Sequence, residues 1–170
     1  MSKPRLKNVI ASMALGLALG ASALTGCTGS SSDDPSTTAS ATVGPEARTE
    51  ALWAGRTEYV GDSSKVIALV DAAGFGPRGT YTLSLRTTRP PFAVTIDLPH
   101  PAKPFEQTDF SAAATILLGT VRNLDAVHVT SQGKTYTLTA KEATAALGRD
   151  VKTLGTDREA LAGYVRSLQD

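Results

Sequence analysis

The first regular pattern of apolar and polar positions outside the N-terminal segment lies between residues 62 and 73. Apolar side chains recur there at helical spacing, at Val66, Ile67, Val70 and Ala73. Asp62 precedes the pattern, and its carboxylate can accept hydrogen bonds from the free amides of a first helical turn. Gly74 follows it, and glycine commonly ends a helix. The pattern therefore predicts a helix over residues 62–73.

Two segments with strict alternation follow this helix. In the first, Tyr81, Leu83 and Leu85 alternate with Thr82, Ser84 and Arg86. In the second, after Arg89-Pro90-Pro91, Phe92, Val94, Ile96 and Leu98 alternate with Ala93, Thr95 and Asp97. Alternation of this kind is typical of strands with one buried and one solvated face. We therefore predict two strands here.

The same order of patterns then repeats. A helix predicted over residues 109–122 places apolar side chains on one side, at Phe110, Ala113, Ala114, Leu117, Leu118 and Val121. Two further alternating segments follow, with Val127 and Val129 in the first and Tyr136 and Leu138 in the second. Gln132-Gly133 lies between them and predicts a tight hairpin turn.

Two more helices are predicted near the C-terminus, each from a capping box. In this motif a Thr hydroxyl and a Glu carboxylate three residues later satisfy each other's free amides. The motif occurs at Thr139-Ala140-Lys141-Glu142 and again at Thr156-Asp157-Arg158-Glu159. The last helix then presents Leu161, Tyr164, Val165 and Leu168 at helical spacing.

These elements together predict an α+β fold with the order αββ-αββ-αα. All four strands alternate, so each has one solvated face. This favours a four-stranded, mainly antiparallel sheet with the helices packed on one face.

The N-terminus has the parts of an export signal in order. Lys3, Arg5 and Lys7 precede an uncharged, mostly apolar run over residues 9–24, which is shorter than the ~20 residues of a membrane-spanning helix. Leu24-Thr25-Gly26-Cys27 follows and resembles the bacterial lipobox. The resemblance implies cleavage between Gly26 and Cys27, the only cysteine, and a lipid on its sulfur. The alternative is an ordinary secretory signal with an incidental cysteine.

The composition after Cys27 predicts the domain organisation. Residues 28–45 have almost no large apolar side chains and cannot bury enough surface to fold. We therefore predict a signal peptide over 1–26, a lipidated cysteine with a flexible tether over 27–45, and one globular domain over 46–170. Without the three signal cations, 14 of the 17 basic side chains remain against 16 acidic ones, a net charge of −2. This charge excludes the basic character expected of a nucleic-acid-binding domain.

Several phrases of the domain resemble DUF4825, an uncharacterised bacterial family. The most specific phrase is Tyr59-Val60-Gly61-Asp62-Ser63-Ser64-Lys65-Val66, and weaker ones lie at residues 81–85, 117–125 and 148–151. The resemblance extends over about residues 50–170. Family members commonly look exported or attached to membranes, which agrees with the lipobox. The family brings no activity, cofactor or catalytic residue to this chain.

Candidate catalytic and metal sites are weak. Gly61-Asp62-Ser63 and Asp125-Ala126-Val127-His128 resemble two blocks of the SGNH esterases, in which the serine is the nucleophile and the histidine the base. The other blocks of that fold are missing. Ser131 and Lys134 match a Ser-x-x-Lys spacing only across a hairpin turn. His100 and His128 lie on different elements, so we expect no metal site. Trp53 and Tyr59 are expected to close one end of the core, or alternatively to hold a ligand.

The solvated face of the sheet is the remaining candidate. It is expected to carry Thr82, Ser84, Arg86, Thr95, Asp97, His128, Thr130, Thr135, Thr137 and Thr139, and a threonine-rich solvent face would look the same. Within it, Arg86, Asp97, His128, Thr130 and Thr137 form the predicted interaction face. We expect a non-enzymatic interaction module on the outer side of the cell membrane, without a cofactor. Its expected partners are membrane lipid, through Cys27, and another cell-envelope protein. The alternatives are a carrier of a small amphiphile held between sheet and helices, and the esterase.

Overall fold

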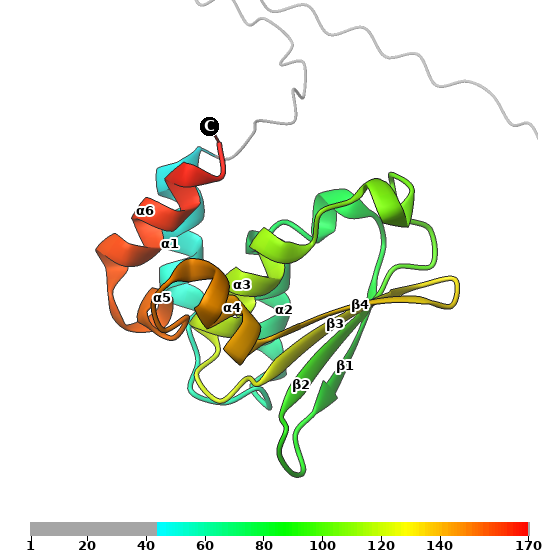
Figure 1. Ribbon diagram of the computed structural model, residues 1–170, viewed down its shortest axis with the longest axis horizontal. Helices are drawn as coiled ribbons and strands as arrows, with labels where there is room; N and C mark the ends of the chain where they lie inside the picture. Colours follow the sequence, from blue (N-terminus) through cyan, green and yellow to red (C-terminus); the bar gives the residue numbers. More distant parts are fainter. Residues whose placement is uncertain (1–43, 170) are drawn as a thin grey trace, which may run out of the picture. The chain divides into compact units, whose positions relative to one another are not determined.

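The computed structural model describes residues 44–169, so the predicted signal peptide, Cys27 and residues 28–43 lie outside the described residues. The described elements, in chain order, are α1 (Pro45–Gly55), α2 (Ser63–Ala72), the short 3₁₀ helix η1 (Gly76–Arg78), β1 (Thr82–Arg86), β2 (Ala93–Asp97), the 3₁₀ helix η2 (Phe105–Gln107), α3 (Ser111–Thr120), β3 (Ala126–Ser131), β4 (Lys134–Thr139), α4 (Ala140–Leu147), α5 (Thr153–Thr156) and α6 (Arg158–Ser167) (Figure 1).

The four strands form one sheet in the order β1-β2-β3-β4. The pairs β1–β2 and β3–β4 are antiparallel, and the central pair β2–β3 is parallel. A hairpin joins each antiparallel pair, whereas α3 connects β2 to β3 as a crossover, which parallel strands require. The prediction of an α+β fold with a mainly antiparallel sheet and packed helices is confirmed.

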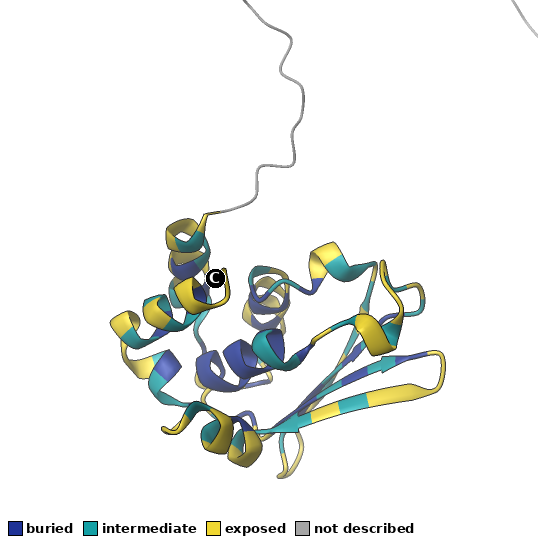
Figure 2. Cartoon of the chain, turned by 45° about the horizontal axis from the view of Figure 1, so that its top comes forward, coloured by how far each residue is buried: buried dark blue, intermediate teal, exposed yellow. Residues whose placement is uncertain are grey.

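Helix α3 forms the centre of the core. All the apolar residues predicted for its buried side are buried, but burial is not confined to one side, because every residue from Ala113 to Thr120 is buried (Figure 2). The helix contacts β3 and β4 on the sheet side and α1, α2, α4 and α5 around the rest of its circumference. A helix enclosed in this way needs an apolar or small side chain at almost every position.

Helix α2 forms where it was predicted, although its buried side differs. The Asp62 side chain caps it by accepting from the amide of Lys65, and Gly74 follows it with a φ of 98°. Its buried side chains include Leu69, while Ile67 is 46% exposed. The prediction that Ile67 belongs to the buried stripe was therefore wrong. Leu69 has the spacing of i+3 from Val66, and Ile67 is turned about 100° away from Val66.

Two helices were absent from the predicted order. Helix α1 begins at Pro45, which the sequence pattern placed at the end of the tether, and it buries only Thr49 and Leu52. Helix α5 is one turn long and buries Leu154. The observed order is therefore ααββ-αββ-ααα. Helix α1 has few large apolar side chains and α5 is a single turn, so neither shows a clear helical period. Pro45 at the first position and Glu46 in the first turn of α1 are nevertheless helix-start signals.

The predicted turns and caps were mostly found. Gln132 and Gly133 have φ values of 49° and 83°, as a tight hairpin requires. Thr139 and Glu142 form the capping box of α4. The second capping box was wrong, because Asp157 caps α6 and accepts from the amides of Glu159 and Ala160. Thr156 instead belongs to α5, which the sequence pattern did not predict.

Candidate functional site

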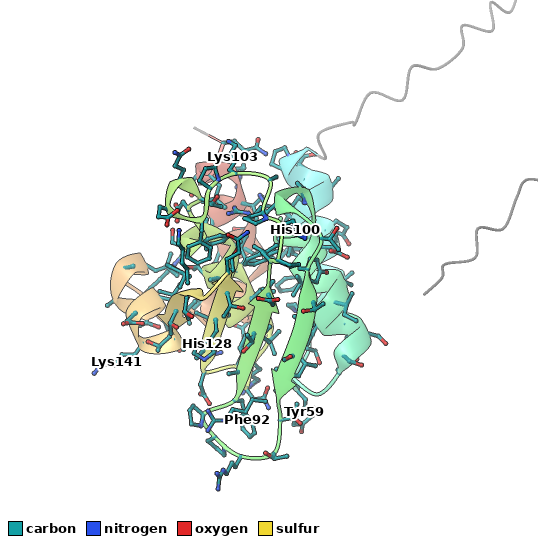
Figure 3. The ribbon with its side chains drawn as sticks, turned by 90° about the vertical axis from the view of Figure 1, so that its right-hand side faces the viewer. Tyr59, Phe92, His100, Lys103, His128 and Lys141 are labelled. Atoms are coloured by element: carbon teal, nitrogen blue, oxygen red, sulfur yellow. The ribbon has the colours of Figure 1, made fainter. Side chains whose placement is uncertain are left out.

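The face of the sheet opposite α3 is open to solvent. Figure 3 shows the strands in front of the helices, with His128 among the side chains of this open face. Strand pairing aligns its residues in three rows, which are Thr82–Asp97–Thr130–Thr135, Ser84–Thr95–His128–Thr137 and Arg86–Ala93–Ala126–Thr139. All the residues predicted for the solvated face lie in these rows.

Two of the rows contain hydrogen bonds between side chains of neighbouring strands. The Thr130 hydroxyl donates to the Asp97 carboxylate at 2.6 Å. The Nδ1 atom of His128 and the Thr137 hydroxyl lie 2.9 Å apart. These bonds hold four of the five predicted interaction residues in defined positions, and Arg86, the fifth, is exposed on the edge strand β1. The structure thus brings all five residues to one face.

A shallow trough of about 780 Å³ lies at one end of this face. Its lining consists of Arg86, Pro90, Pro91, Ala93, Asp125, Ala126, His128, Thr137, Thr139, Ala140 and Lys141. The small side chains of Ala93 and Ala126 are paired on adjacent strands, so they leave the depression between larger neighbours. Sequence reasoning placed Ala93 in the alternating pattern but missed the trough. The signal was available, as two alanines at outward-facing strand positions.

The rims of the trough carry charge. Arg86 on β1 and Lys141 in the first turn of α4 lie at opposite sides, with three interstrand spacings, roughly 14 Å, between β1 and β4. Asp125 contributes a carboxylate, but this group already accepts from the backbone amide of Phe92 at 2.7 Å. The trough therefore combines an apolar floor with cationic rims.

A second cavity of about 550 Å³ lies beside the C-terminal end of α3 and is lined in part by Lys152. The Lys152 ammonium donates to the carbonyl oxygens of Leu118, Val121 and Leu124 at 2.7, 3.1 and 2.7 Å. Burial lowers the pKa of Lys152 to about 8, and the charges of Asp125 and Asp150 oppose this shift. Because its three N–H groups are all used in closing the end of α3, this lysine has a structural role.

The residues of the esterase hypothesis are engaged elsewhere. Ser63 begins α2, where Asp62 is the N-cap. His128 lies against Thr137 on the open sheet face, and the Asp125 carboxylate holds the Phe92 amide. A serine hydrolase instead requires the base to bond the nucleophile and the acid to orient the base. The observed bonds do not form such a relay.

The remaining candidate residues are likewise separated. Ser131 is buried, and the Lys134 ammonium pairs with the carboxylate of Glu106. His100 lies on the loop between β2 and α3, away from His128 on β3 (Figure 3). Within residues 44–169, no group of three or more His, Cys, Asp or Glu side chains could hold a metal ion.

Trp53 and Tyr59 do not act as a pair. The Trp53 ring packs against the core, and the Arg56 guanidinium lies 3.2 Å above its centroid. Tyr59, in contrast, is 69% exposed. The expectation that both rings close the core was therefore wrong for Tyr59. The buried neighbour is Val60, whose amide donates to the side-chain oxygen of Asn123 at 2.7 Å.

The phrases that resembled a known family lie at structural positions. Asn123 and Asp125 each accept a backbone amide from a distant segment, that of Val60 and that of Phe92. Gly119 lies against α5, where an added Cβ would come within 2.7 Å of the Cβ of Leu154. The family model for a domain of unknown function (DUF4825) matches residues 52–141, more than half of the 170-residue chain. The chain belongs to the DUF4825 family.

The DUF4825 match begins in α1 and ends in the first turn of α4. It therefore includes the whole sheet, α2 and α3, while the phrase at residues 148–151 lies outside it. No curated protein and no solved structure gave a significant match. Among residues 44–169, we find no helix with the length and apolar character needed to cross a membrane.

Proposed function

We propose that this DUF4825 protein is a lipid-anchored, non-enzymatic interaction module that binds another cell-envelope protein through the open face of its sheet. The main support is this face itself. No helix within residues 44–169 covers its four strands, and ordered polar side chains lie there beside an apolar trough. An apolar centre with a polar, charged surround is the usual composition of a protein–protein interface.

The chemistry of the face supports a protein partner. Arg86 and Lys141 on the rims, with Asp97 in a different row, give a pattern of both charge signs that a complementary surface can match. Patterns of this kind contribute specificity and orientation more than affinity. The carrier alternative gains less support, because the side chains between sheet and helices form a continuous buried core and the trough opens at the surface.

The lipid anchor rests on the N-terminal sequence. A cationic head, a 16-residue apolar run and the lipobox-like Leu24-Thr25-Gly26-Cys27 are the features that support it. An anchor would hold the domain at the outer surface of the cell membrane, where envelope proteins are available as partners. It also gives the single cysteine a use that does not require a disulfide.

Site-specific photo-crosslinking in intact cells tests the interaction. A photoreactive amino acid replaces Ser84 on the open face or, as a matched control, Ala162 on α6. We expect one discrete crosslinked product from position 84 and none from position 162. The charge reversals Arg86→Glu and Asp97→Lys should reduce the product at least about tenfold, because like charges would then oppose each other. Arg166→Glu on α6 should have no effect.

The opposite results are equally informative. Equal products from both positions, or a product from position 84 that survives both charge reversals, would contradict the sheet-face interface. A complete absence of products from position 84 in membrane-attached protein would contradict the interaction module and move the proposal to a small ligand in the trough.

A further inference from the structure

A third cavity, of about 480 Å³, lies at the end of the domain where α1 begins. It is bounded by the first turn of α1, the segment after α2 and the loop between β2 and α3, on which Figure 3 labels His100 and Lys103. Its charged lining residues are Arg48, Arg78, Lys103 and Asp109. The trough of the proposed interface is a separate cavity with different lining residues.

Three successive carbonyl groups hold the two arginines side by side. The Arg48 guanidinium donates to Ala72 at 2.9 Å and to Ala73 at 2.7 Å. The Arg78 Nε donates to the next carbonyl, that of Gly74, at 3.0 Å. Arg78 also donates to the backbone carbonyl of Asp109. Both guanidinium groups are thus fixed in orientation before any ligand binds, which lowers the entropic cost of binding.

The pair has more positive charge than its protein neighbours balance. The four ion pairs found within residues 44–169 include neither Arg48 nor Arg78. Burial lowers the pKa of Arg48 and the charge of Arg78 lowers it further, yet an arginine stays protonated in a protein. Each guanidinium also has more N–H groups than these bonds use. Two half-buried cations held together in this way favour a bound anion.

The acidic residue in the lining, Asp109, does not neutralise the cavity. Its carboxylate accepts from the Ser111 amide at 2.8 Å, and the hydrogen bonds with Ser111 are the main reason that its pKa is lowered. Three cationic side chains and one carboxylate leave a net charge of +2. The two negative charges of a phosphate monoester would balance that charge, whereas a single carboxylate would balance only half of it.

The rest of the lining indicates an organic group beside the anion. Leu98, Pro77, Pro101 and Phe110 form apolar walls, and the cavity volume falls in the range of small-ligand sites. Arginine binds phosphate oxygens through paired N–H groups, a geometry that suits this ligand class. We propose that this cavity binds the phosphate group of a small organic phosphate, held by Arg48 and Arg78 with Lys103 at its mouth.

Calorimetric titration of the full-length chain in non-ionic detergent tests the site with glycerol 3-phosphate. Native mass spectrometry then tests a lipid headgroup as the source of the phosphate, by comparing dihexanoyl-phosphatidic acid, a phosphate monoester, with dihexanoylglycerol, which lacks the phosphate. We expect saturable binding of at least one phosphate compound and none of dihexanoylglycerol. If only the phospholipid binds, the ligand of this site is a lipid headgroup. If glycerol 3-phosphate binds, the ligand is a soluble phosphate metabolite. Added sodium chloride should weaken binding.

Variants separate this site from a purely structural role of the arginines. Arg78→Gln should abolish binding, but it also removes the guanidinium bonds to the carbonyls of Gly74 and Asp109. Lys103→Gln changes an exposed side chain and should weaken binding about three- to tenfold. Asp109→Asn should instead tighten it, because it removes the negative charge of the lining while its amide oxygen can still accept from Ser111. Lys141→Gln, at the distant trough, is the control. Absence of saturable binding, or affinities unchanged in both Lys103→Gln and Asp109→Asn, would overturn the proposal.

Discussion

The Lys152 ammonium closes the C-terminal end of α3, the most buried helix of the described residues, and is itself partly buried there. Its pKa is lowered from the ordinary 10.5 to about 8, mainly by burial. As the pH falls, the unfolded chain therefore takes up this proton before the folded chain does. Its contribution to the free energy of unfolding is greatest above pH 10.5 and decreases as the pH falls towards 8.

A comparison with Lys152→Met isolates this titration. The free energy of unfolding of the wild type, minus that of the variant, should rise by about 1–2 kcal/mol between about pH 7.5 and pH 10.5. This is less than the full shift implies, because part of the side chain remains in solvent. Urea unfolding at several pH values measures the difference, and Lys141→Met, an exposed lysine, should show no such slope. If the difference in the free energy of unfolding instead decreased as the pH rose, the three carbonyls would raise the pKa of Lys152 above its ordinary value.

Helices α3 and α5 approach each other closely at two glycines. An added Cβ on Gly119 would lie 2.7 Å from the Leu154 Cβ and 2.8 Å from the Val151 carbonyl oxygen. A Cβ on Gly155 would overlap the carbonyl oxygen of Gly119. Both contacts are with backbone or Cβ atoms, which cannot move without displacing a helix. The two glycines therefore set the distance between these helices.

Gly119→Ala should lower the free energy of unfolding by about 1–3 kcal/mol through this overpacking. Gly163→Ala is the matched control, because nothing lies within 4 Å of its added Cβ in α6. It should raise stability by up to about 1 kcal/mol through helix propensity. Chemical denaturation of both variants gives the comparison. Equal effects of the two substitutions would show that the α3–α5 contact tolerates a methyl group.

Also at the level of elements, the sequence predicted those helices, strands and turns that have a regular apolar pattern or a short sequence motif. The alternation in residues 81–86 and 92–98 placed β1 and β2, and Gln132-Gly133 placed the β3–β4 turn. The single-turn helix α5 escaped prediction because a helix of four residues has no period to recognise. Its presence also explains why the N-cap of α6 was predicted one residue too early. Thr156 is the last residue of α5, so the cap of α6 is the next residue, Asp157.

At the scale of the whole molecule, the sequence predicted which residues share the open face but not the cavities. Alternation alone assigns His128 and Thr137 to one side of the sheet, and register then places them opposite each other. The arginine pair was not predictable in this way. Arg48 lies in an unpredicted helix and Arg78 in a 3₁₀ turn, and only tertiary packing brings both to the carbonyls after α2.

The proposed anchor makes a prediction for the whole chain in the cell. Two acyl chains on Cys27 would hold the protein on the membrane, since each buried methylene contributes about 0.8 kcal/mol and one chain alone binds only marginally. Cells grown with labelled palmitate should therefore yield a labelled, membrane-bound protein. Cys27→Ala should carry no label, and the chain should no longer be cleaved before residue 27.

The control for this experiment is Ser30→Ala, which leaves the lipobox-like residues intact and should change neither label nor fractionation. Intact-mass measurement of the membrane-bound form gives a second readout, because cleavage and lipid addition change the mass in opposite directions. Ala21-Ser22-Ala23 has the small residues of an ordinary secretory cleavage site, so an unlabelled wild-type protein cleaved after Ala23 would instead identify an ordinary secretory signal. The interaction module would then act as a released protein, and its partner would have to be sought outside the membrane as well as on it.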